Sequence, residues 1–372
     1  SNFYLFYFAA IGVLVPFWGL YLKSLGFNAR EIGELVAIIM ATKVVAPYLW
    51  GWIADHTGHD LLIVRLASVL SFLLFALIFV SDSYWSIALV MMAFSFFWNA
   101  ALPQFEAMTM NHLGSSEADY SKIRVWGSLG FVAAVVLMGW QLETHDTSLI
   151  PMVLLSLYGL IMLSTFCLPS SEKARVIADQ PSIIIVLKKP VVLALIAVCF
   201  LVQFSHGSYY TFYTIYLEDH GYQRSHIGAL WALGVIAEVL IFLTIHRLLP
   251  KYGHRLLLLI TLILTTLRWV LIAYFVESMA VIIFAQILHA ASFGLFHAIA
   301  ISLFHRYFIG KHQGRGQAIY ASVSFGAGGA IGSLFSGYSW ETFGSTTSFM
   351  ISAVSVMLAV VVAFRYIKTT KT

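Results

Sequence analysis

Long apolar runs separated by short polar turns form the hydrophobic pattern of this chain. Each run holds about 20 mostly apolar residues, the length that an α-helix needs to cross the hydrocarbon core of a bilayer. The turns between the runs, such as "KSLGFNARE" and "EDHGYQRSH", carry Gly and charged residues that interrupt helices. The pattern predicts twelve spans, at 3–22, 32–53, 61–81, 84–110, 121–142, 149–168, 190–216, 225–245, 255–276, 279–304, 316–338 and 346–366.

The composition agrees with lipid as the solvent of these runs. Of the 372 residues, 60% are hydrophobic and 10% are charged, whereas a soluble domain carries about 25% charged residues. Helices are expected because lipid offers no partner for free backbone N–H and C=O groups. A transmembrane β-barrel would instead show alternating segments of about ten residues. The predicted fold class is an all-α membrane protein with twelve transmembrane helices.

Lys and Arg indicate the orientation of the spans. With the N-terminus placed inside, 16 of the 21 Lys and Arg residues fall on the inner side and three on the outer side, and Lys43 and Arg268 fall within spans. Such a bias predicts that both termini are cytoplasmic. We expect a multi-pass protein of a bacterial inner membrane. The net charge of +4 reflects this bias, and we expect no nucleic-acid partner.

The sequence divides into two halves that resemble each other. The stretch "YLKSLGFNAREIG" recurs as "YLEDHGYQRSHIG" at a fixed offset, with Tyr, Leu, Gly, Ile and Gly in the same positions. We predict an N-terminal six-helix half at 1–168, a cytoplasmic linker at 169–189 and a C-terminal six-helix half at 190–372. Parallel repeats of this kind are typical of a large transporter class with substrate at the repeat interface.

Charged residues inside spans are the candidate functional groups. Lys43, Glu238 and Arg268 lie at least seven residues from either end of their spans, which at about 1.5 Å per residue places them deep in the bilayer, toward its midplane. Such residues face a water-filled path or pair with one another, and a structural ion pair remains the alternative for each. Other polar residues within spans are Glu106, Arg124, His206, His289 and His297.

Other classes of membrane protein find less support in the sequence. HExxH, CxxC and paired-carboxylate motifs are missing from it, so we expect no enzyme activity, catalytic residue, metal or cofactor. A membrane-embedded acyltransferase with a catalytic histidine is the enzyme alternative, but nothing marks its partner residues. A receptor or a channel agrees less well with a twelve-span repeat.

Several stretches resemble a known family. The chain is similar to the phenylpropionate permeases of the major facilitator superfamily, a branch close to lactose permease. The similarity covers nearly the whole chain, and its most specific stretches are "PFWGLYLKSLG", "DYSKIRVWGSLGFV", "YYTFYTIYLEDHGY", "IGALWALGVIAEVLIF", "LRWVL" and "AQILHAASFGLFH". The resemblance implies proton-coupled uptake of a small, carboxylated aromatic compound.

The resemblance to lactose permease also implies roles for single residues. Glu106 and Arg124 resemble its sugar-binding carboxylate and arginine on the fourth and fifth helices. Glu238 resembles the eighth-helix glutamate that links sugar to proton. Arg268 and His289 resemble the ninth-helix arginine and the tenth-helix histidine.

The chain departs from lactose permease at four places. Ser292 stands where that family member has its proton-carrying carboxylate, and Gln286 replaces a lysine. Phe131 replaces the sugar-stacking tryptophan, which weakens a sugar interpretation. The loop "GWIADHTGHD" keeps Asp55 of the superfamily's gating motif but lacks its basic residues, so Asp55 is the candidate gating residue.

These residues together predict a proton-coupled symporter for an aromatic carboxylate. Lys43 with Arg268 or Arg124 would hold the carboxylate, since a carboxylate that leaves water needs a cation. Trp18, Phe131, Tyr209 and Tyr213 would form an aromatic wall, and Glu106 and His289 complete the candidate substrate site.

Three points about transport stay open in the sequence. The proton carrier is Glu238, Glu106 or His289. The alternative substrate is a sugar or nucleoside moved by the same coupling, and an exporter of hydrophobic cations agrees poorly with two buried cations. The expected partners are a small molecule, protons and membrane lipid, and we expect a monomer.

Overall fold

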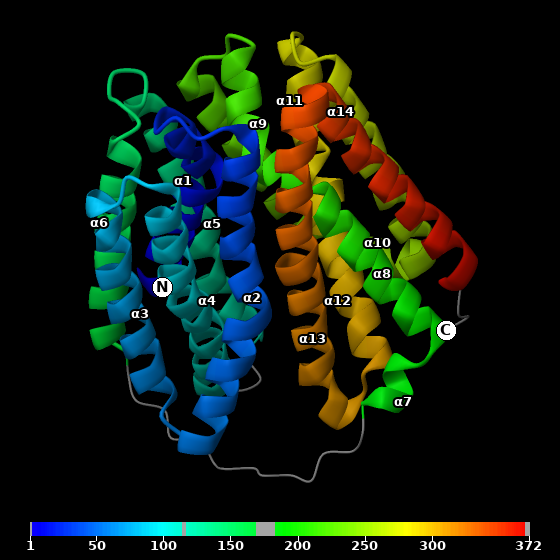
Figure 1. Ribbon diagram of the computed structural model, residues 1–372. Coiled ribbons are helices and arrows are strands. Elements are labelled where there is room, and N and C mark those ends of the chain that lie inside the picture. The colour runs from blue at the N-terminus through cyan, green and yellow to red at the C-terminus, as the bar shows by residue number, and fades with distance from the viewer. Residues whose placement is uncertain (1, 114–116, 169–182, 369–372) are drawn as a thin grey trace. The chain divides into compact units, whose positions relative to one another are not determined.

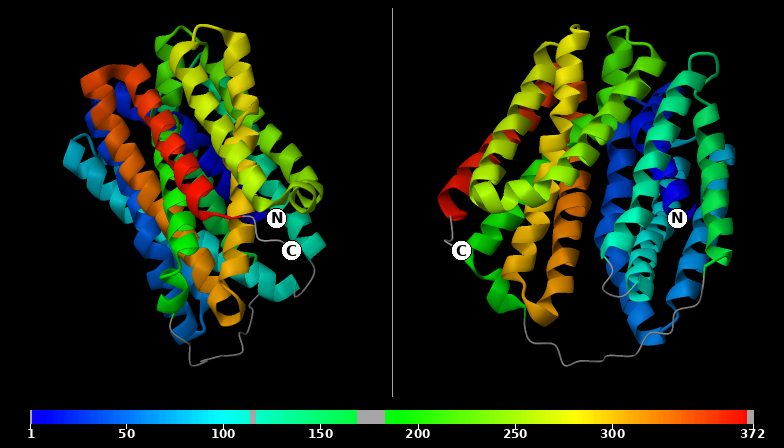
Figure 2. Two further views of the ribbon diagram at one scale, coloured as in Figure 1. Left: turned by 90° about the vertical axis from the view of Figure 1, so that its right-hand side faces the viewer. Right: turned by 180° about the vertical axis from the view of Figure 1, so that it is seen from behind.

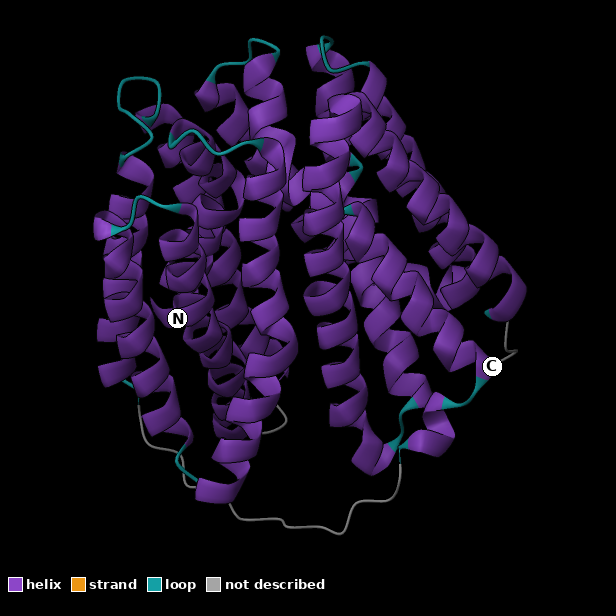
Figure 3. Ribbon diagram, viewed as in Figure 1, coloured by secondary structure: helices purple, strands orange, loops and turns teal. Residues whose placement is uncertain are grey.

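The computed structural model describes residues 2–113, 117–168 and 183–368, and within these ranges the chain forms only helices and loops (Figures 1 and 3). Ten continuous helical segments are long and apolar enough to cross a membrane. Two of them, Arg224–Tyr274 and Gln313–Tyr366, have 51 and 54 residues and are interrupted by left-handed glycines, Gly253 at φ 75° and Gly344 at φ 83°. Dividing them there gives the twelve spans that the sequence predicts.

The described chain forms two compact units. The first comprises residues 1–178 together with 222–232, and the second comprises 179–221 and 233–372. Most of the predicted linker, residues 169–182, lies outside the described residues.

The first unit is a bundle of six long helices. α1 packs on α5 and α6, and α4 packs on α2 and α3. A group of aromatic rings from α3, α4 and α6, including Phe75, Phe94 and Tyr158, fills the space between these helices. The helices are α1 (Asn2–Ser24), α2 (Ala29–Thr57), α3 (Asp60–Ala76), α4 (Tyr84–Leu113), α5 (Glu117–Gln141) and α6 (Leu149–Phe166), with a 3₁₀ turn at Leu77–Val80.

Local sequence signals explain where α2 begins and ends. Asn28 accepts a hydrogen bond from the backbone N–H of Glu31, and the Glu31 carboxylate accepts one from the backbone N–H of Asn28. This reciprocal pair is a capping box, which stabilises a helix N-terminus. Gly58 ends the helix in the left-handed conformation, at φ 72°, which glycine adopts without a steric penalty.

Glycines allow the backbones of α1 and α5 to touch. A Cβ atom on Gly130 would lie 2.1 Å from the carbonyl oxygen of Leu5, and one on Gly12 would lie 2.7 Å from that of Phe131. Small residues at helix contacts are typical of membrane proteins, where close packing replaces the hydrophobic driving force. The contact fixes Phe131 against α1.

The second unit is built around α14, which packs on α8 and α9 (orange to red on green in Figures 1 and 2). Two of its spans contain a π-helical segment, at Ala290–Leu295 and at Ser322–Gly328. π-helical segments inside longer helices are frequent at functional sites. The helices are α7 (Ile184–Leu187), α8 (Pro190–Ser205), α9 (Gly207–Asp219), α10 (Arg224–Tyr274), α11 (Met279–Ile287), α12 (Phe296–Tyr307), α13 (Gln313–Ala321) and α14 (Gly329–Tyr366), with a 3₁₀ turn at Gly310–His312.

The first turns of α10 belong to the first unit. A Cβ atom on Gly228 would lie 2.6 Å from the carbonyl oxygen of Val135 in α5. At the adjacent loop, Arg224 donates to the carbonyl oxygen of Leu142 at 3.0 Å, and the backbone N–H of Ser225 donates to the Glu143 carboxylate at 2.8 Å. The eighth span is therefore anchored at its beginning to the fifth.

Candidate functional site

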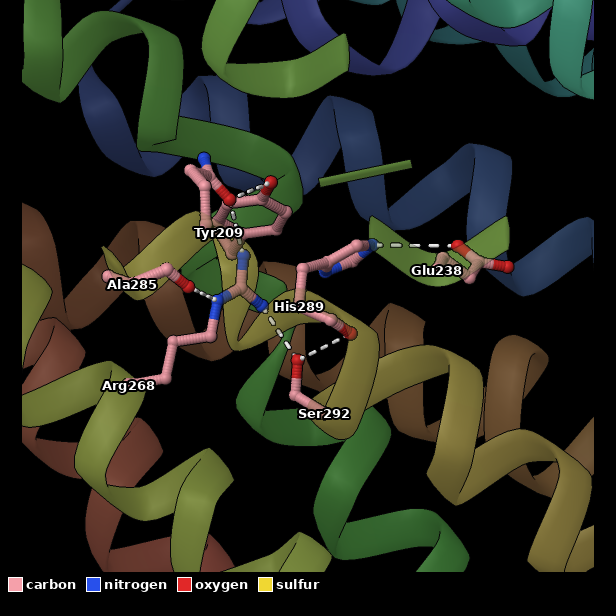
Figure 4. A network of polar contacts seen from close by, with 7 residues as sticks. Tyr209, Glu238, Arg268, Ala285, His289 and Ser292 are labelled. Atoms are coloured by element: carbon pink, nitrogen blue, oxygen red, sulfur yellow. Dashed lines mark hydrogen bonds and ion pairs between the residues drawn. The ribbon is translucent and has the colours of Figure 1, made fainter. Parts of the chain in front are cut away.

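A buried acid and a histidine form the centre of the candidate site in the second unit. Glu238 in α10 and His289 at the end of α11 approach to 3.8 Å, measured from Oε2 to Nε2. Both side chains are largely buried, at 17% and 7% exposure. Figure 4 shows the His289 ring pointing toward Glu238. Because a carboxylate and an imidazole can both bind a proton, this pair can exchange or share one.

Two glycines make room for the Glu238–His289 pair. Gly294, in the π-helical segment that follows His289, faces Glu238 so closely that a Cβ atom there would lie 2.8 Å from Cγ of Glu238. Gly234, one turn before Glu238, lies against the His289 ring, where a Cβ atom would come within 3.3 Å of Cδ2. The sequence alone does not indicate a role for these two glycines, because their contacts with Glu238 and His289 depend on how the helices pack.

Arg268 is fully buried and held by groups of its own unit. Its Nε donates to the carbonyl oxygen of Ala285 at 3.0 Å, and its two terminal nitrogens donate to Ser292 at 2.9 Å and to Gln286 at 3.0 Å (Figure 4). The guanidinium also lies over the rings of Tyr209 and Trp269, at 4.3 and 4.7 Å. Ser292 and Gln286, which the sequence marks only as departures from lactose permease, are thus the partners of this arginine.

Tyr209 and Tyr213 of the expected aromatic wall lie side by side in the second unit. Their ring centroids are 4.7 Å apart, and both side chains are buried. Tyr209 also donates to Gln286 at 3.2 Å, and its ring lies 5.8 Å from that of His289. Tyr209 therefore connects the Arg268 cluster to the Glu238–His289 pair.

In the first unit, Glu106 and Arg124 come together as a half-exposed pair. The carboxylate oxygen Oε1 of Glu106 lies 3.9 Å from Nε of Arg124. The guanidinium lies over the ring of Phe8 at 4.0 Å, and Gly127 leaves space for it, since a Cβ atom there would lie 2.8 Å from its Nη1. Ion pairs that remain partly exposed are weak, so we expect this pair to add little to stability.

Lys43 forms no hydrogen bond or ion pair with any residue that the structure describes. It lies in α2 beside a polar seam, in which Thr42 bonds to Ser95 at 2.9 Å and accepts from Asn99 at 2.9 Å. An ammonium group inside a span is expensive without a compensating partner. Among the residues that the structure describes, Lys43 therefore lacks a compensating partner.

The other two aromatic residues of the expected wall lie in the interior of the first unit. Trp18 is 1% exposed and packs on Tyr21 and Phe75, and its Nε1 has no partner among the described residues. Phe131 lies against α1 at Gly12. Asp55, the expected gating residue, lies in α2, but its side chain is outside the described part of the structure.

His206 and His297 occupy two further positions in the second unit. His297 binds Tyr320 at 2.8 Å through Nδ1, and its ring stacks on Phe293. His206 is fully buried in the seventh span, between α8 and α9, and its backbone stays helical at φ −77° and ψ −8°.

Twelve membrane-crossing helices in two compact units, with charged groups inside spans of each unit, are typical of a secondary transporter of the major facilitator type. The profile of the family described as "MFS_1 like family" matches residues 1–351, and the chain belongs to this family. It is a multi-pass membrane protein that carries a small molecule, and it is a transporter and not an enzyme.

Known relatives differ in the substrates that their names give. The chain is 30% identical to the probable 3-phenylpropionic acid transporter of Escherichia coli strain K12, over 95% of this chain and 93% of that protein. It is 23% identical to the maltose permease of Geobacillus stearothermophilus, over 100% of this chain and 94% of that protein. Among solved structures, a mutant of the nucleoside transporter NupG superimposes with a TM-score of 0.88 at 18% identity, covering 99% of this chain and 98% of that one. At that identity the likeness concerns the fold alone.

Proposed function

We propose that this protein is a proton-coupled symporter that imports a small aromatic carboxylate by alternating access. The observation that carries the coupling is the buried Glu238–His289 pair, 3.8 Å apart. Its expected place is a bacterial inner membrane, as a monomer with both termini in the cytoplasm. The proton and the substrate would stabilise the same rearranged state, so that the proton gradient drives accumulation of the substrate.

The pair suits a proton carrier because two opposing influences act on the protonation of Glu238. Removal from water favours the neutral carboxyl, whereas a nearby cation favours the carboxylate. Small changes in the surroundings of Glu238 would therefore change its protonation as the protein opens to one side and then to the other. Glu106 is the alternative carrier, but its pair with Arg124 is half-exposed.

The substrate class rests on Lys43 and on the relative from Escherichia coli. A carboxylate would supply the partner that Lys43 does not find among the described residues. The relative that is 30% identical to this chain is named for a compound with one ring and one carboxylate. Arg268 contributes a second positive charge in the other unit, although its hydrogen bonds are already occupied by Ala285, Gln286 and Ser292.

A neutral sugar or nucleoside is the second candidate substrate. The maltose permease relative and the half-exposed Glu106–Arg124 pair favour it, because a carboxylate and a guanidinium can bind hydroxyl groups. Competition in proteoliposomes separates the two candidates. We expect 3-phenylpropionate to compete for uptake, and 3-phenylpropanamide, maltose and uridine to compete poorly. Equal competition by the amide, the sugar or the nucleoside would refute the anionic substrate class.

The coupling is tested by the substitution Glu238→Gln, with Glu277→Gln as a matched control in an exposed loop. We expect Glu238→Gln to lose accumulation driven by a pH gradient while it still exchanges pre-loaded substrate. With a gradient of two pH units, the loss is about 100-fold in the accumulation ratio for one coupled proton. Full accumulation by the mutant would assign the proton to another group.

A further inference from the structure

The seventh span contains a buried histidine that the proposed coupling does not use. α8 ends at Ser205 and α9 begins at Gly207, so that His206 lies at the junction. The junction is held closely against α14, because a Cβ atom on Gly207 would lie 2.1 Å from the carbonyl carbon of Gly332.

The contacts of His206 define which of its ring nitrogens carries a proton in the neutral form. Nδ1 lies 2.8 Å from the carbonyl oxygen of Val202, and since a carbonyl oxygen only accepts, Nδ1–H is the donor. Nε2 therefore carries a lone pair. This atom is buried and has no hydrogen-bond partner among the described residues. Buried polar atoms without partners are rare and often have a functional role.

His206 lies in the same aromatic setting as Arg268. Its ring meets that of Trp269 edge to face at 5.0 Å, and the Arg268 guanidinium lies 4.7 Å from the centre of the same ring. Trp269 also donates to Ser205, directly before the junction, at 3.1 Å. Across Tyr209, His289 has a second buried imidazole nitrogen, Nδ1, without a described partner. Two imidazoles thus flank one guanidinium.

The ionisable groups around His206 are predominantly basic or neutral. α14, at the junction, contributes Gly332 and Ser333, which do not titrate near neutral pH. Glu238 is the acid of this region, and it is already paired with His289. The ionisable groups that face the cluster are Tyr209 and Tyr210 from α9, Glu238 and Arg268 from α10, and His289 from the tenth span.

We propose that His206 takes up a proton at Nε2 when an anionic substrate binds. The inference rests on the proposed function, because it requires a carboxylate as substrate. A second positive charge beside Arg268 is opposed by Coulomb repulsion in this dry setting, and an arriving carboxylate offsets that repulsion. A new N–H bond forms at Nε2, and a hydronium ion loses the proton and becomes water. By linkage, the proton strengthens substrate binding as much as the substrate strengthens proton binding.

The number of protons taken up per bound substrate tests the proposal. Calorimetric titration of the purified protein with 3-phenylpropionate, repeated in buffers of different ionisation enthalpy, measures this number. His206→Asn can keep an N–H donor near Val202 and removes Nε2, while His246→Asn is an exposed control. We expect His206→Asn to take up about one proton fewer per substrate, which removes about a tenfold change in Kd per pH unit. His246→Asn should match the parent.

The possible outcomes separate this inference from the proposed function. If 3-phenylpropionate does not bind the parent protein, both the substrate class and the inference fail. If it binds, and His206→Asn takes up as many protons as the parent, only the role of His206 is refuted. Infrared difference spectra with ¹⁵N-labelled histidine give a second readout. A substrate-induced imidazolium band that is present in the parent and lost in His206→Asn supports the inference, and the absence of any such band from the parent overturns it.

Discussion

Gly294 should be as necessary for coupling as the acid that it faces. A Cβ atom at this position would lie 2.8 Å from Cγ of Glu238 and 2.8 Å from Cγ2 of Ile241. Non-bonded carbon atoms prefer separations of about 3.5–4.0 Å, so Gly294→Ala requires a displacement of roughly 0.7–1.2 Å. Both residues lie in α10, but the β-branched Ile241 side chain is stiff at χ1, so the longer Glu238 side chain is the group that moves more readily.

The distance between Glu238 and His289 gives the size of the effect. At an effective dielectric constant of 20, two unit charges 3.8 Å apart attract by about 4.4 kcal/mol, and at 4.8 Å by about 3.5 kcal/mol. The difference of about 0.9 kcal/mol changes the population of the paired state roughly fivefold. Overpacking of the helix contact adds about 1–3 kcal/mol of destabilisation.

Uptake in proteoliposomes, driven by a pH gradient and compared with exchange at equal pH, separates coupling from transport. We expect Gly294→Ala to lower the accumulation ratio several-fold and to reduce exchange less. Gly314→Ala is the matched control, because its Cβ atom would meet no other atom within 4 Å. Wild-type accumulation by Gly294→Ala, with normal folding and insertion, would refute the argument that Glu238 needs this space.

Three further substitutions test other parts of the molecule. Lys43→Ala should raise the Kd of 3-phenylpropionate more than tenfold, or about 1.4 kcal/mol, in a calorimetric titration, and an unchanged Kd excludes Lys43 as the anion site. Arg124→Lys keeps the charge but loses the guanidinium that lies over the Phe8 ring at 4.0 Å. We expect the variant to bind 3-phenylpropionate roughly two- to fivefold more weakly, and an affinity equal to that of the parent contradicts this. The hydrogen bond from the Ser225 backbone N–H holds the pKa of Glu143 below its ordinary value of 4.5. The ionised Glu143 therefore stabilises the folded protein fully above pH 4.5, and this stabilisation is lost as pH falls through the lowered pKa. Glu143→Gln should therefore lower the melting temperature at pH 7, and the difference should close in acid; a difference independent of pH refutes the assignment.

The spans could be predicted from the sequence because lipid imposes one requirement on every residue inside it. A run of about 20 apolar residues has few alternatives to a membrane helix. The capping box at Asn28 and the left-handed Gly253 and Gly344 are local signals as well, so the helix ends near them follow from short stretches. Assignment of residues 222–232 to the first unit depends on contacts with α5, which no local pattern encodes.

The candidate site was only partly predictable, because a local pattern indicates which residues are unusual but not which residues they contact. Depth within a span selects Glu238, Arg268 and Lys43, because a charge in lipid is expensive wherever it occurs. The depth of a residue within its span does not indicate which side chains it pairs with. That Ser292 completes the hydrogen bonds of Arg268 follows from the packing of α10 against the tenth span. That Nε2 of His206 is buried without a described partner also depends on the packing around the ring, which no local sequence pattern encodes.

Lys43 and Arg268, the two cations inside spans that the sequence singles out, differ in a way that bears on how an anion would be recognised. Arg268 has hydrogen bonds at all three of its nitrogens, so a substrate must displace Gln286 or Ser292 or interact through the field of the guanidinium alone. Lys43 has no described partner to displace. Breaking a buried hydrogen bond to a charged group costs about 1.5–3 kcal/mol, whereas pairing the Lys43 ammonium removes an existing penalty. Pairing with a carboxylate would therefore cost less at Lys43 than at Arg268, where the anion must first displace a hydrogen-bond partner or act through the field of the guanidinium.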